Sequence, residues 1–376
     1  MSRHLNIVCL DVPWPPDYGG AIDMMNRIME LKKIGVAIHL HYFSYNERGT
    51  PNELNQYCEN IYVYERKTGY KGVSTRLPYI IASRVNEELI RNLQKNDFPI
   101  LLEGIHCTGI LQHLELNNRK IVVRMHNEES LYYKEMARAA TNFFKRLYFS
   151  NESRLLKKYN YHLPKESVYA CVSKEDIRVL KEDYQLPKVI FLPTFPTWQK
   201  VKCNEGIGNF CLYHGNLSVP ENEEAACWLL RKVFSQIRTP LVIAGKKPSR
   251  RLMKQAHLCQ HTCLVANPSE TEINDLVRKA HIHVLPGFNK NITGIRLKLL
   301  HALFEGRHCV TNDAMVEGTG LESACHIGNN ADAFASIIMQ LYHHPFGEDE
   351  ILLRKKLLEN TFNNSANTEM LSQYLW

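Results

Sequence analysis

The sequence has no apolar run that approaches the roughly 18 residues that a helix needs to span a bilayer. Its first apolar segment, Leu5 to Leu10, is too short for a signal peptide and is ended by Asp11, so we expect no secretory leader. There is no Cys-x-x-Cys pair, and the eleven cysteines are scattered and odd in number. These absences argue against a disulfide framework and predict reduced thiols in a cytoplasmic protein.

Internal repeats, low-complexity tracts and coiled-coil heptads are also absent, and no Asp-x-Asp cluster is present to hold a metal ion. The composition that remains is that of a globular protein, with 44% hydrophobic residues. A chain of 376 residues is too long for one ordinary domain and fits two. The net charge of +7 favours an anionic ligand or an anionic membrane surface, and it does not by itself indicate nucleic acid.

Short apolar strands alternate with helical patterns along the whole chain. In the first half, the segment 21–34 has apolar residues on a helical period and is closed by Gly35. Ser173, three residues before Asp176, is expected to cap another helix. The expected strands are 6–10, 36–43, 100–102, 120–125, 168–172, 189–192 (an edge strand), 210–214, 241–244, 282–285 and 309–311, and the expected helices of the second half are 223–234, 271–279, 297–304 and 331–342.

This alternation predicts an α/β fold with parallel sheets that are covered by helices on both faces. The pattern lapses between Thr194 and Gly208, where we place the linker between two domains. We therefore predict two Rossmann-like domains, residues 1–195 and 196–360, that face each other across a central cleft.

The segment Gly294 to Lys298 is the strongest local signal. It follows a strand that ends at Leu285 and opens an apolar helix that stops at Gly306. A glycine followed by Arg296 and Lys298 places backbone N–H groups and two cations at a helix N-terminus, an arrangement that binds phosphate. The alternative is a solvated first helical turn, although the helix dipole disfavours basic residues there.

Ligands of open α/β sheets bind beyond the carboxyl ends of the strands, so polar residues at strand exits are site candidates. A Gly-Gly turn alone is weak evidence, since a tight turn with positive φ explains it equally well. The candidates at strand exits are Gly19, Gly20, Glu103, His106, His126, Asn127, Glu128, Gly215, Asn216, Gly245, Lys246 and the segment 294–298.

These motifs resemble the GT-B-fold glycosyltransferases, and most closely the retaining, sugar-nucleotide-dependent enzymes of family 4. The resemblance covers nearly the whole chain, and the block that begins at Thr293 is its most specific part. The motifs that carry it are Pro13–Gly20, Val123–Glu128, Val172–Ser173, His214–Leu217 with Pro220–Asn222, and Thr293–Leu300 with Ala302, Gly306, Val310–Thr311 and Glu317–Gly318.

The resemblance implies a GT-B architecture whose C-terminal helix, 361–376, packs back on the first domain. It also implies roles for the candidate residues. His126, Arg296 and Lys298 would be catalytic, with His126 beside the transferred sugar and the two cations on the diphosphate. The donor-binding set would be Gly215, Asn216, Gly245, Lys246, Thr293, Gly294, Ile295 and Glu317, and the acceptor-side set Gly19, Gly20, Glu103, His106, Asn127 and Glu128.

One departure from the family pattern concerns two glutamates that usually stand eight positions apart around the donor block. Here these positions hold Thr293 and His301, neither of which is acidic. The second glutamate normally holds the ribose hydroxyls of the donor, and Glu305, one helical turn later, is a candidate replacement. The loss favours an alternative in which the protein binds a nucleotide sugar or glycan without transferring it; a GT-B-fold epimerase is a weaker third reading.

Two further patterns admit opposing interpretations. His257, Cys259, His261 and Cys263 alternate as zinc ligands on one strand would, but one strand cannot wrap a tetrahedral ion, so helix-end histidines and a short buried strand explain them better. The segment 143–162 mixes aromatic with basic residues. It would either lie on an anionic membrane surface or bury its aromatics in a domain core.

We therefore expect a cytoplasmic glycosyltransferase, in peripheral contact with the inner face of the cell membrane, that takes part in cell-surface polysaccharide biosynthesis. The resemblance implies transfer with retention from a nucleotide-sugar donor to a glycan or lipid-linked acceptor. It implies no metal and no cofactor, because cations and helix N-terminal amides stabilise the leaving diphosphate. Nucleic acid is not an expected partner.

Overall fold

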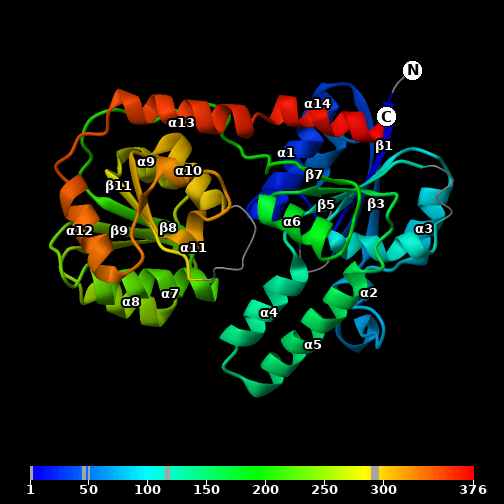
Figure 1. The fold of residues 1–376 in the computed structure, drawn as a ribbon, viewed down its shortest axis with the longest axis horizontal. Coiled ribbons are helices and arrows are strands. Elements are labelled where there is room, and N and C mark those ends of the chain that lie inside the picture. Colours follow the sequence, from blue (N-terminus) through cyan, green and yellow to red (C-terminus); the bar gives the residue numbers. More distant parts are fainter. Residues whose placement is uncertain (1–2, 45–47, 50, 115–118, 289–295) are drawn as a thin grey trace. The chain divides into compact units, whose positions relative to one another are not determined.

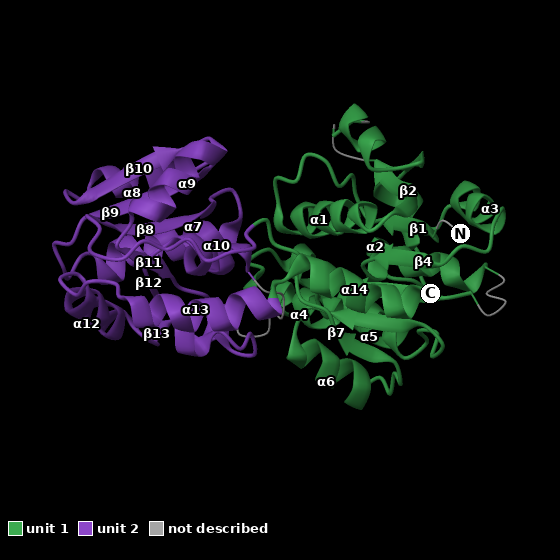
Figure 2. Cartoon of the chain, turned by 90° about the horizontal axis from the view of Figure 1, so that it is seen from above, with its two compact units in different colours: residues 1–197, 291–294, 362–376 green, residues 198–290, 295–361 purple. Residues whose placement is uncertain are grey.

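The structure is a computed structural model that describes residues 3–44, 48–49, 51–114, 119–288 and 296–376. The chain divides into two compact units (Figure 2). Unit 1 contains Met1–Thr197 and Phe362–Trp376, and unit 2 contains Trp198–Lys290 and Ile295–Thr361. The change from one unit to the other after Thr197 lies inside the segment that lacks a regular pattern in the sequence.

Unit 1 is built on a seven-stranded parallel sheet with the order β3-β2-β1-β4-β5-β6-β7. Leu5 and Ile7 of β1 lie in one apolar core, and the next residue, Val8, lies in the other, so both faces of the sheet are buried. This explains why these strands read as short continuous apolar runs. The strands are β1 Arg3–Cys9, β2 Val36–Ser44, β3 Asn60–Glu65, β4 Ile100–Glu103, β5 Ile121–Met125, β6 Val168–Cys171 and β7 Val189–Phe191.

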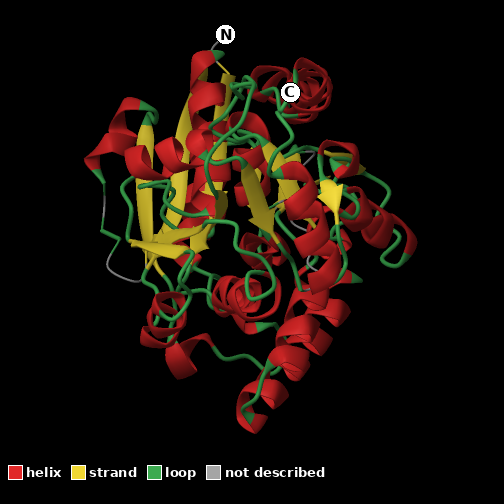
Figure 3. Ribbon diagram, turned by 90° about the vertical axis from the view of Figure 1, so that its left-hand side faces the viewer, coloured by secondary structure: helices red, strands yellow, loops and turns green. Residues whose placement is uncertain are grey.

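Helices pack around this sheet; Figure 3 shows the helices in red and the strands in yellow. Ser173 caps α6 as predicted, because its hydroxyl accepts a hydrogen bond from the backbone N–H of Asp176 at 3.0 Å. The helices of unit 1 are α1 Gly19–Lys33, α2 Tyr79–Ala82, α3 Glu87–Gln94, α4 Glu129–Ala139, α5 Phe143–Asn160, α6 Lys174–Glu182 and α14 Asn364–Leu375, and a 3-10 segment spans Ile105–Gln112.

The C-terminal helix α14 packs against α1. Leu371 and Leu375 are fully buried in the core of unit 1, and Tyr374 and Trp376 pack against the same core. The apolar end of the chain therefore belongs to the first unit, although about 160 residues of unit 2 precede it in sequence.

Unit 2 is built on a six-stranded parallel sheet with the order β10-β9-β8-β11-β12-β13. Its strands are β8 Cys211–Asn216, β9 Leu241–Lys246, β10 Thr262–Ala266, β11 Ile282–Leu285, β12 His308–Thr311 and β13 His326–Ile327. Its helices are α7 Pro220–Trp228, which continues as a π-helical turn at Leu229–Val233, α8 Arg250–His257, α9 Glu270–Lys279, α10 Leu297–Glu305, α11 Asp313–Val316, α12 Ala331–Leu341 and α13 Glu348–Thr361 (Figure 1).

Two predicted strand exits of unit 2 are wrong in detail. Gly215 and Asn216 are the last residues of β8, and Gly245 and Lys246 are the last residues of β9. The ladder continues through them because Gly215 pairs with Gly245 and Asn216 with Lys246. Gly245 permits this close approach, since a Cβ there would lie 1.9 Å from the carbonyl oxygen of Gly215.

The two units together form the GT-B fold that the sequence predicts, with two Rossmann-like parallel sheets flanked by helices. Within the described part of the chain, no helix has both the length and the apolar character to cross a membrane. All eleven cysteines are free thiols.

Candidate functional site

The carboxyl edge of the unit 2 sheet gathers the predicted cations beside the start of α7. Arg296 is the residue before α10, and its guanidinium contacts the carboxylate of Glu221 at 2.5 Å. Lys298 lies in the first turn of α10, and its Nζ donates a hydrogen bond to Oδ1 of Asn222 at 2.9 Å. Two sequence segments more than 70 residues apart thus form one cluster of charged and amide groups.

Lys298 is the more unusual of the two cations. Its ammonium lies 5.2 Å from the ring centre of Tyr213, in a cation–π arrangement, and 3.5 Å from the Tyr213 hydroxyl. Burial, together with the neighbouring charge of Arg296, lowers the pKa of Lys298 to about 8. A partly buried lysine with a lowered pKa in the first turn of a helix is a candidate for a functional site.

The end of β8 joins the same cluster through Asn222. The amide of Asn222 donates to the carbonyl oxygen of Asn216 at 2.9 Å while its own oxygen accepts from Lys298. Asn216 and Lys298, both predicted as site residues, are therefore held together by Asn222, which the sequence analysis named within the motif Pro220–Asn222 but gave no role in the site. Tyr213 was missed, and Glu221 was named only within the same motif, since the contacts of both residues depend on the fold.

The other donor-side candidates are less closely connected. Lys246 is exposed and pairs in the ladder with Asn216, while Gly215 and Gly245 supply the tight spacing of the two strands. Glu317 is exposed and follows α11 directly. Thr293, Gly294 and Ile295 lie outside the described residues.

Three buried histidines lie together in unit 2. The rings of His214 and His301 are 5.4 Å apart, His283 lies 6.1 Å from His214, and Trp198 stacks on His301 at 4.3 Å. Burial, reinforced by His301, lowers the pKa of His214 well below its usual value, and burial together with Arg278 lowers the pKa of His301 to about 4. The rings are therefore neutral at pH 7.

The nitrogens of His214 make no hydrogen bond within the described part of the chain, and neither does Nε2 of His301. Buried polar atoms without partners are uncommon, so these nitrogens can accept or donate to a water or a ligand hydroxyl. Glu305, considered as a replacement for the missing glutamate, is instead buried and paired with Arg278 at 2.5 Å.

Unit 1 contains a buried charge network at the carboxyl ends of β4 and β5. Arg27 of α1 binds Glu103 through two contacts, at 2.8 and 2.7 Å, and Asp23 at 2.8 Å. Arg124 reaches Asp23 at 3.2 Å and the carbonyl oxygen of Pro193 at 2.9 Å. Although burial opposes ionisation, Arg124 and Arg27 hold the pKa of Asp23 well below its ordinary value.

His126 lies at the rim of this network. Its Nδ1 is 3.6 Å from Asp23 and its Nε2 is 3.3 Å from Glu103, and its side chain is 16% exposed. Glu103 and His126, predicted separately at two strand exits, are therefore direct neighbours, with the histidine as the member that reaches the surface. The sequence analysis missed Asp23, Arg27 and Arg124.

His106 follows β4 in the 3-10 segment and is partly buried. Gly104 precedes it with φ of +90°, and a Cβ at this glycine would lie 2.8 Å from Nδ1 of His106 and 3.6 Å from His126. Burial lowers the pKa of His106 well below its usual value. Gly104 therefore allows the two histidines to approach the same strand end.

The remaining acceptor-side candidates have structural surroundings. Gly19 and Gly20 form the first turn of α1 without positive φ, so the tight-turn alternative does not describe them. Asn127 is partly buried and contacts Glu129 at 3.5 Å. Glu128 caps α4 and accepts from the backbone N–H of Leu131 at 2.6 Å and from three side chains, those of Ser130, Asn160 and Tyr184.

A metal ion does not suit the network of unit 1. Asp23, Glu103 and His126 present ligand atoms within 4.8 Å of one another, but the guanidinium groups of Arg27 and Arg124 already neutralise the two carboxylates. In unit 2, His257 ends α8 and Cys263 lies in β10, as predicted, but Cys263 is exposed, so the prediction that this strand is buried is wrong.

Comparisons with known proteins agree with this architecture. Residues 208–344, which include most of unit 2, match the family described as "Glycosyl transferases group 1". Over 366 residues the chain is 26% identical to an "Uncharacterized 44.6 kDa protein in cps region" from Klebsiella pneumoniae, and the match covers 92% of each chain.

Solved structures extend the similarity to the whole chain. A TarM variant from S. aureus, in complex with fondaparinux, alpha-GlcNAc-glycerol and UDP, aligns with a TM-score of 0.68 and 9% identity over 100% of both chains. Sucrose-phosphate synthase from Thermosynechococcus elongatus aligns with a TM-score of 0.68 and 13% identity, covering 99% of this chain and 98% of that one. The resemblance to GT-B glycosyltransferases is confirmed, while the assignment to family 4 stays a prediction.

Proposed function

We propose that this protein transfers a sugar from a nucleotide-sugar donor to a glycan acceptor with retention of configuration. The observation that carries the proposal is the cluster of Arg296 and Lys298 at the carboxyl edge of the unit 2 sheet, where Rossmann-like sheets bind their ligands. The family matched by residues 208–344 supports sugar transfer as the activity. UDP in the complex of the TarM variant supports a nucleoside diphosphate as the group recognised.

The cluster would act on the leaving group. As the glycosidic bond to the donor breaks, negative charge accumulates on the diphosphate, and preorganised cations stabilise that charge more strongly in the transition state than in the ground state. Lys298 is already desolvated, so its charge would act at low effective dielectric. Glu221 now neutralises Arg296 and would have to yield to the diphosphate.

His126 is the residue we assign to the reacting sugar. It reaches the surface while Asp23 and Glu103 face its two nitrogens, so the carboxylates orient the ring. Because Arg27 and Arg124 neutralise these carboxylates, the network fixes the ring beside the sugar without adding net negative charge. The network thereby gives the histidine a fixed orientation without a metal ion.

The acceptor is assigned to surface polysaccharide on two grounds. The name of the Klebsiella pneumoniae relative places it in a cps region. The start of α5 also exposes apolar rings beside basic residues: Phe143 is 71% exposed and Phe144 is 78% exposed, next to exposed Lys145 and Arg146. These aromatics are not buried in the core, which favours a membrane-surface role and a lipid-linked acceptor.

A second candidate function is binding of a nucleotide sugar without transfer. The specific observation in its favour is His301, which occupies the position of the family's second glutamate and is buried against Trp198. A neutral imidazole cannot provide the two acceptor oxygens that a carboxylate offers to ribose hydroxyls. The unpaired nitrogens of His214 and His301 would then have to supply the contact.

Donor hydrolysis and nucleotide affinity, measured together over a panel of nucleotide sugars, separate the two functions. We expect turnover in the wild type, and we expect His126→Ala to keep its nucleotide affinity but lose at least about 100-fold in kcat, since general acid–base and charge-stabilising groups contribute roughly that much. A matching melting temperature excludes a folding defect. Full turnover in His126→Ala removes the histidine from the mechanism, and tight binding without turnover in the wild type favours the binding protein.

A further inference from the structure

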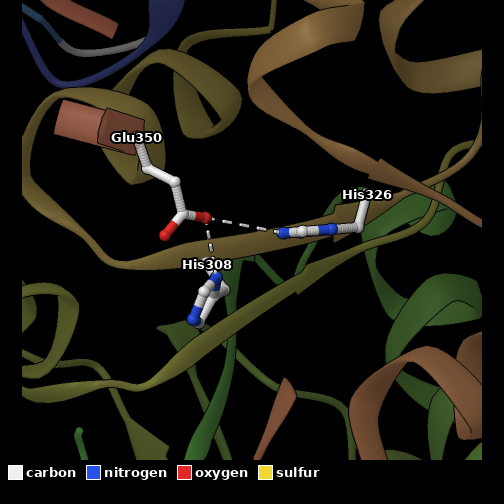
Figure 4. A group of neighbouring side chains, drawn as sticks. All are labelled: His308, His326 and Glu350. Atoms are coloured by element: carbon white, nitrogen blue, oxygen red, sulfur yellow. Dashed lines mark ion pairs between the residues drawn. The ribbon is translucent and has the colours of Figure 1, made fainter. Parts of the chain in front are cut away.

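A second cluster of ligating side chains lies in unit 2, beside the last two strands of the sheet order, β12 and β13. It consists of His308 at the start of β12, His326 at the start of β13 and Glu350 in the first turn of α13 (Figure 4). His308 is the first residue of β12, and His326 pairs with Val310, two residues further along the same strand, so the cluster shares no residue with the diphosphate cluster.

The three side chains point at one another. Nδ1 of His308 is 3.2 Å from Oε1 of Glu350, and Nε2 of His326 is 3.9 Å from the same oxygen. One ligand atom from each residue lies within 4.8 Å of the other two. Tetrahedral zinc with bonds of about 2.0–2.1 Å separates its ligand atoms by about 3.4 Å, so small side-chain adjustments suffice to enclose an ion.

His308 carries the decisive hydrogen-bond argument. Its side chain is fully buried, and Nε2 lies 3.1 Å from the carbonyl oxygen of His344, which can only accept, so Nε2 must carry a proton. In the neutral ring Nδ1 then carries no proton and can only accept a hydrogen bond. It faces Oε1 of Glu350, which also only accepts, at 3.2 Å. Two acceptors at this distance require a cation or a proton between them.

The carbonyl contact is also the outer support that metal-binding histidines usually have, since it fixes the tautomer and the ring orientation. Glu350 is held in a similar way, because its second oxygen accepts from the backbone N–H of Gly347 at 3.1 Å. The nearby His281 is not a ligand: its Nδ1 accepts from the N–H of Gly208 and its Nε2 donates to the carbonyl oxygen of Leu341.

We propose that His308, His326 and Glu350 bind one divalent transition-metal ion, zinc being the best fit to two imidazoles and a carboxylate, with water in the fourth position. The ion is structural. Strand β13 has two residues and pairs with β12 at only Val310↔His326 and Thr311↔Ile327, so a metal would tie this edge strand and α13 to the sheet. The site is independent of the proposed sugar transfer.

The buried guanidinium of Arg354 acts electrostatically on both Glu350 and His326. This guanidinium donates hydrogen bonds to the backbone carbonyl oxygens of Leu303, Gly306 and Arg307. Among the described residues, Arg354 forms no ion pair with Glu350, so the carboxylate of Glu350 stays available to a metal ion.

The test is zinc binding by protein without a polyhistidine tag, measured by competition with a chromophoric chelator, together with the melting temperature with and without zinc. Glu350→Gln and His326→Ala alter partly exposed ligands, so both variants should fold. His257→Ala is the matched control, because His257 is an exposed histidine of the same unit outside the cluster.

We expect one zinc equivalent in the wild type and in His257→Ala, at least a 100-fold loss of affinity in both ligand variants, and a zinc-dependent rise in melting temperature that both variants lack. Cobalt in place of zinc should give the absorption bands of a tetrahedral site. Equal zinc affinity in the wild type and His326→Ala would overturn the proposal, as would the absence of stoichiometric zinc. If no zinc binds, a proton rather than a metal ion lies between His308 and Glu350.

Discussion

At the scale of single residues, the arrangement of Lys298 shows how the fold changes the chemistry of a side chain. The sequence predicts a cation at a helix N-terminus, and the structure adds that it is nearly buried, bonded to Asn222 and over the ring of Tyr213. Its pKa near 8 follows from that burial and from the adjacent Arg296. None of these partners is close to Lys298 in the sequence.

This pKa predicts a pH dependence of nucleotide binding. A lysine whose pKa is about 8 is charged below that pH and neutral above it, so affinity for a nucleoside diphosphate should fall as pH rises through 8. Between pH 7 and 9 the charged fraction falls about tenfold, and the affinity should fall by about the same factor. Calorimetric titrations with UDP at several pH values measure it.

Lys298→Gln is the control, because it removes the titrating group and should bind weakly with a flat profile over this range. If the wild type and Lys298→Gln show the same pH slope, the titrating group is another one, and Lys298 does not contact the diphosphate.

At the scale of secondary-structure elements, the strands could be predicted because each is a short apolar run buried on both faces, as Leu101 and Val122 illustrate. The ends of β8 and β9 could not be predicted, because glycine usually ends a strand. The pairing of Gly215 with Gly245 keeps both strands extended through these glycines. Arg27 could not be predicted as a buried residue for a similar reason. In the sequence it is a charged residue of a helix, and only the ion pair with Glu103, far along the chain, offsets the cost of burying its charge.

The N-terminal half of α5 makes a prediction at this scale. Helices α4 and α5 form a hairpin in unit 1, and Figure 1 shows it projecting from the rest of that unit. Because Phe143 and Phe144 are exposed beside basic residues, the protein should co-sediment with vesicles of phosphatidylcholine and phosphatidylglycerol, and more weakly with phosphatidylcholine alone.

The partition coefficient of the double variant Phe143→Ser, Phe144→Ser into these vesicles should fall about tenfold or more. The reason is that each CH₂-sized apolar group in the bilayer contributes about 0.8 kcal/mol to binding. Leu352→Ser, which alters an exposed leucine on α13, is the matched control and should bind as the wild type does. If the double variant co-sediments with the vesicles as strongly as the wild type does, the exposed rings do not mediate membrane binding.

At the scale of the whole molecule, the sequence predicts two Rossmann-like units and a C-terminal helix that belongs to the first of them. The fold followed from the alternation of strands and helices and from the apolar ending at Leu371 and Leu375. The partners of the candidate site residues, Glu221, Asn222 and Asp23 among them, could not be predicted, because a single sequence does not show which of its polar residues meet across a sheet edge.

Calorimetric titration of UDP, GDP and ADP into the wild type, Arg296→Ala and Lys298→Ala tests the central claim most directly. We expect at least one nucleotide to bind the wild type, and we expect each variant to lose about 1.5–3 kcal/mol, the usual contribution of a hydrogen bond to a charged group. Unchanged melting temperatures exclude unfolding. Affinities in both variants equal to that of the wild type would contradict the assignment of this cluster as the donor diphosphate site.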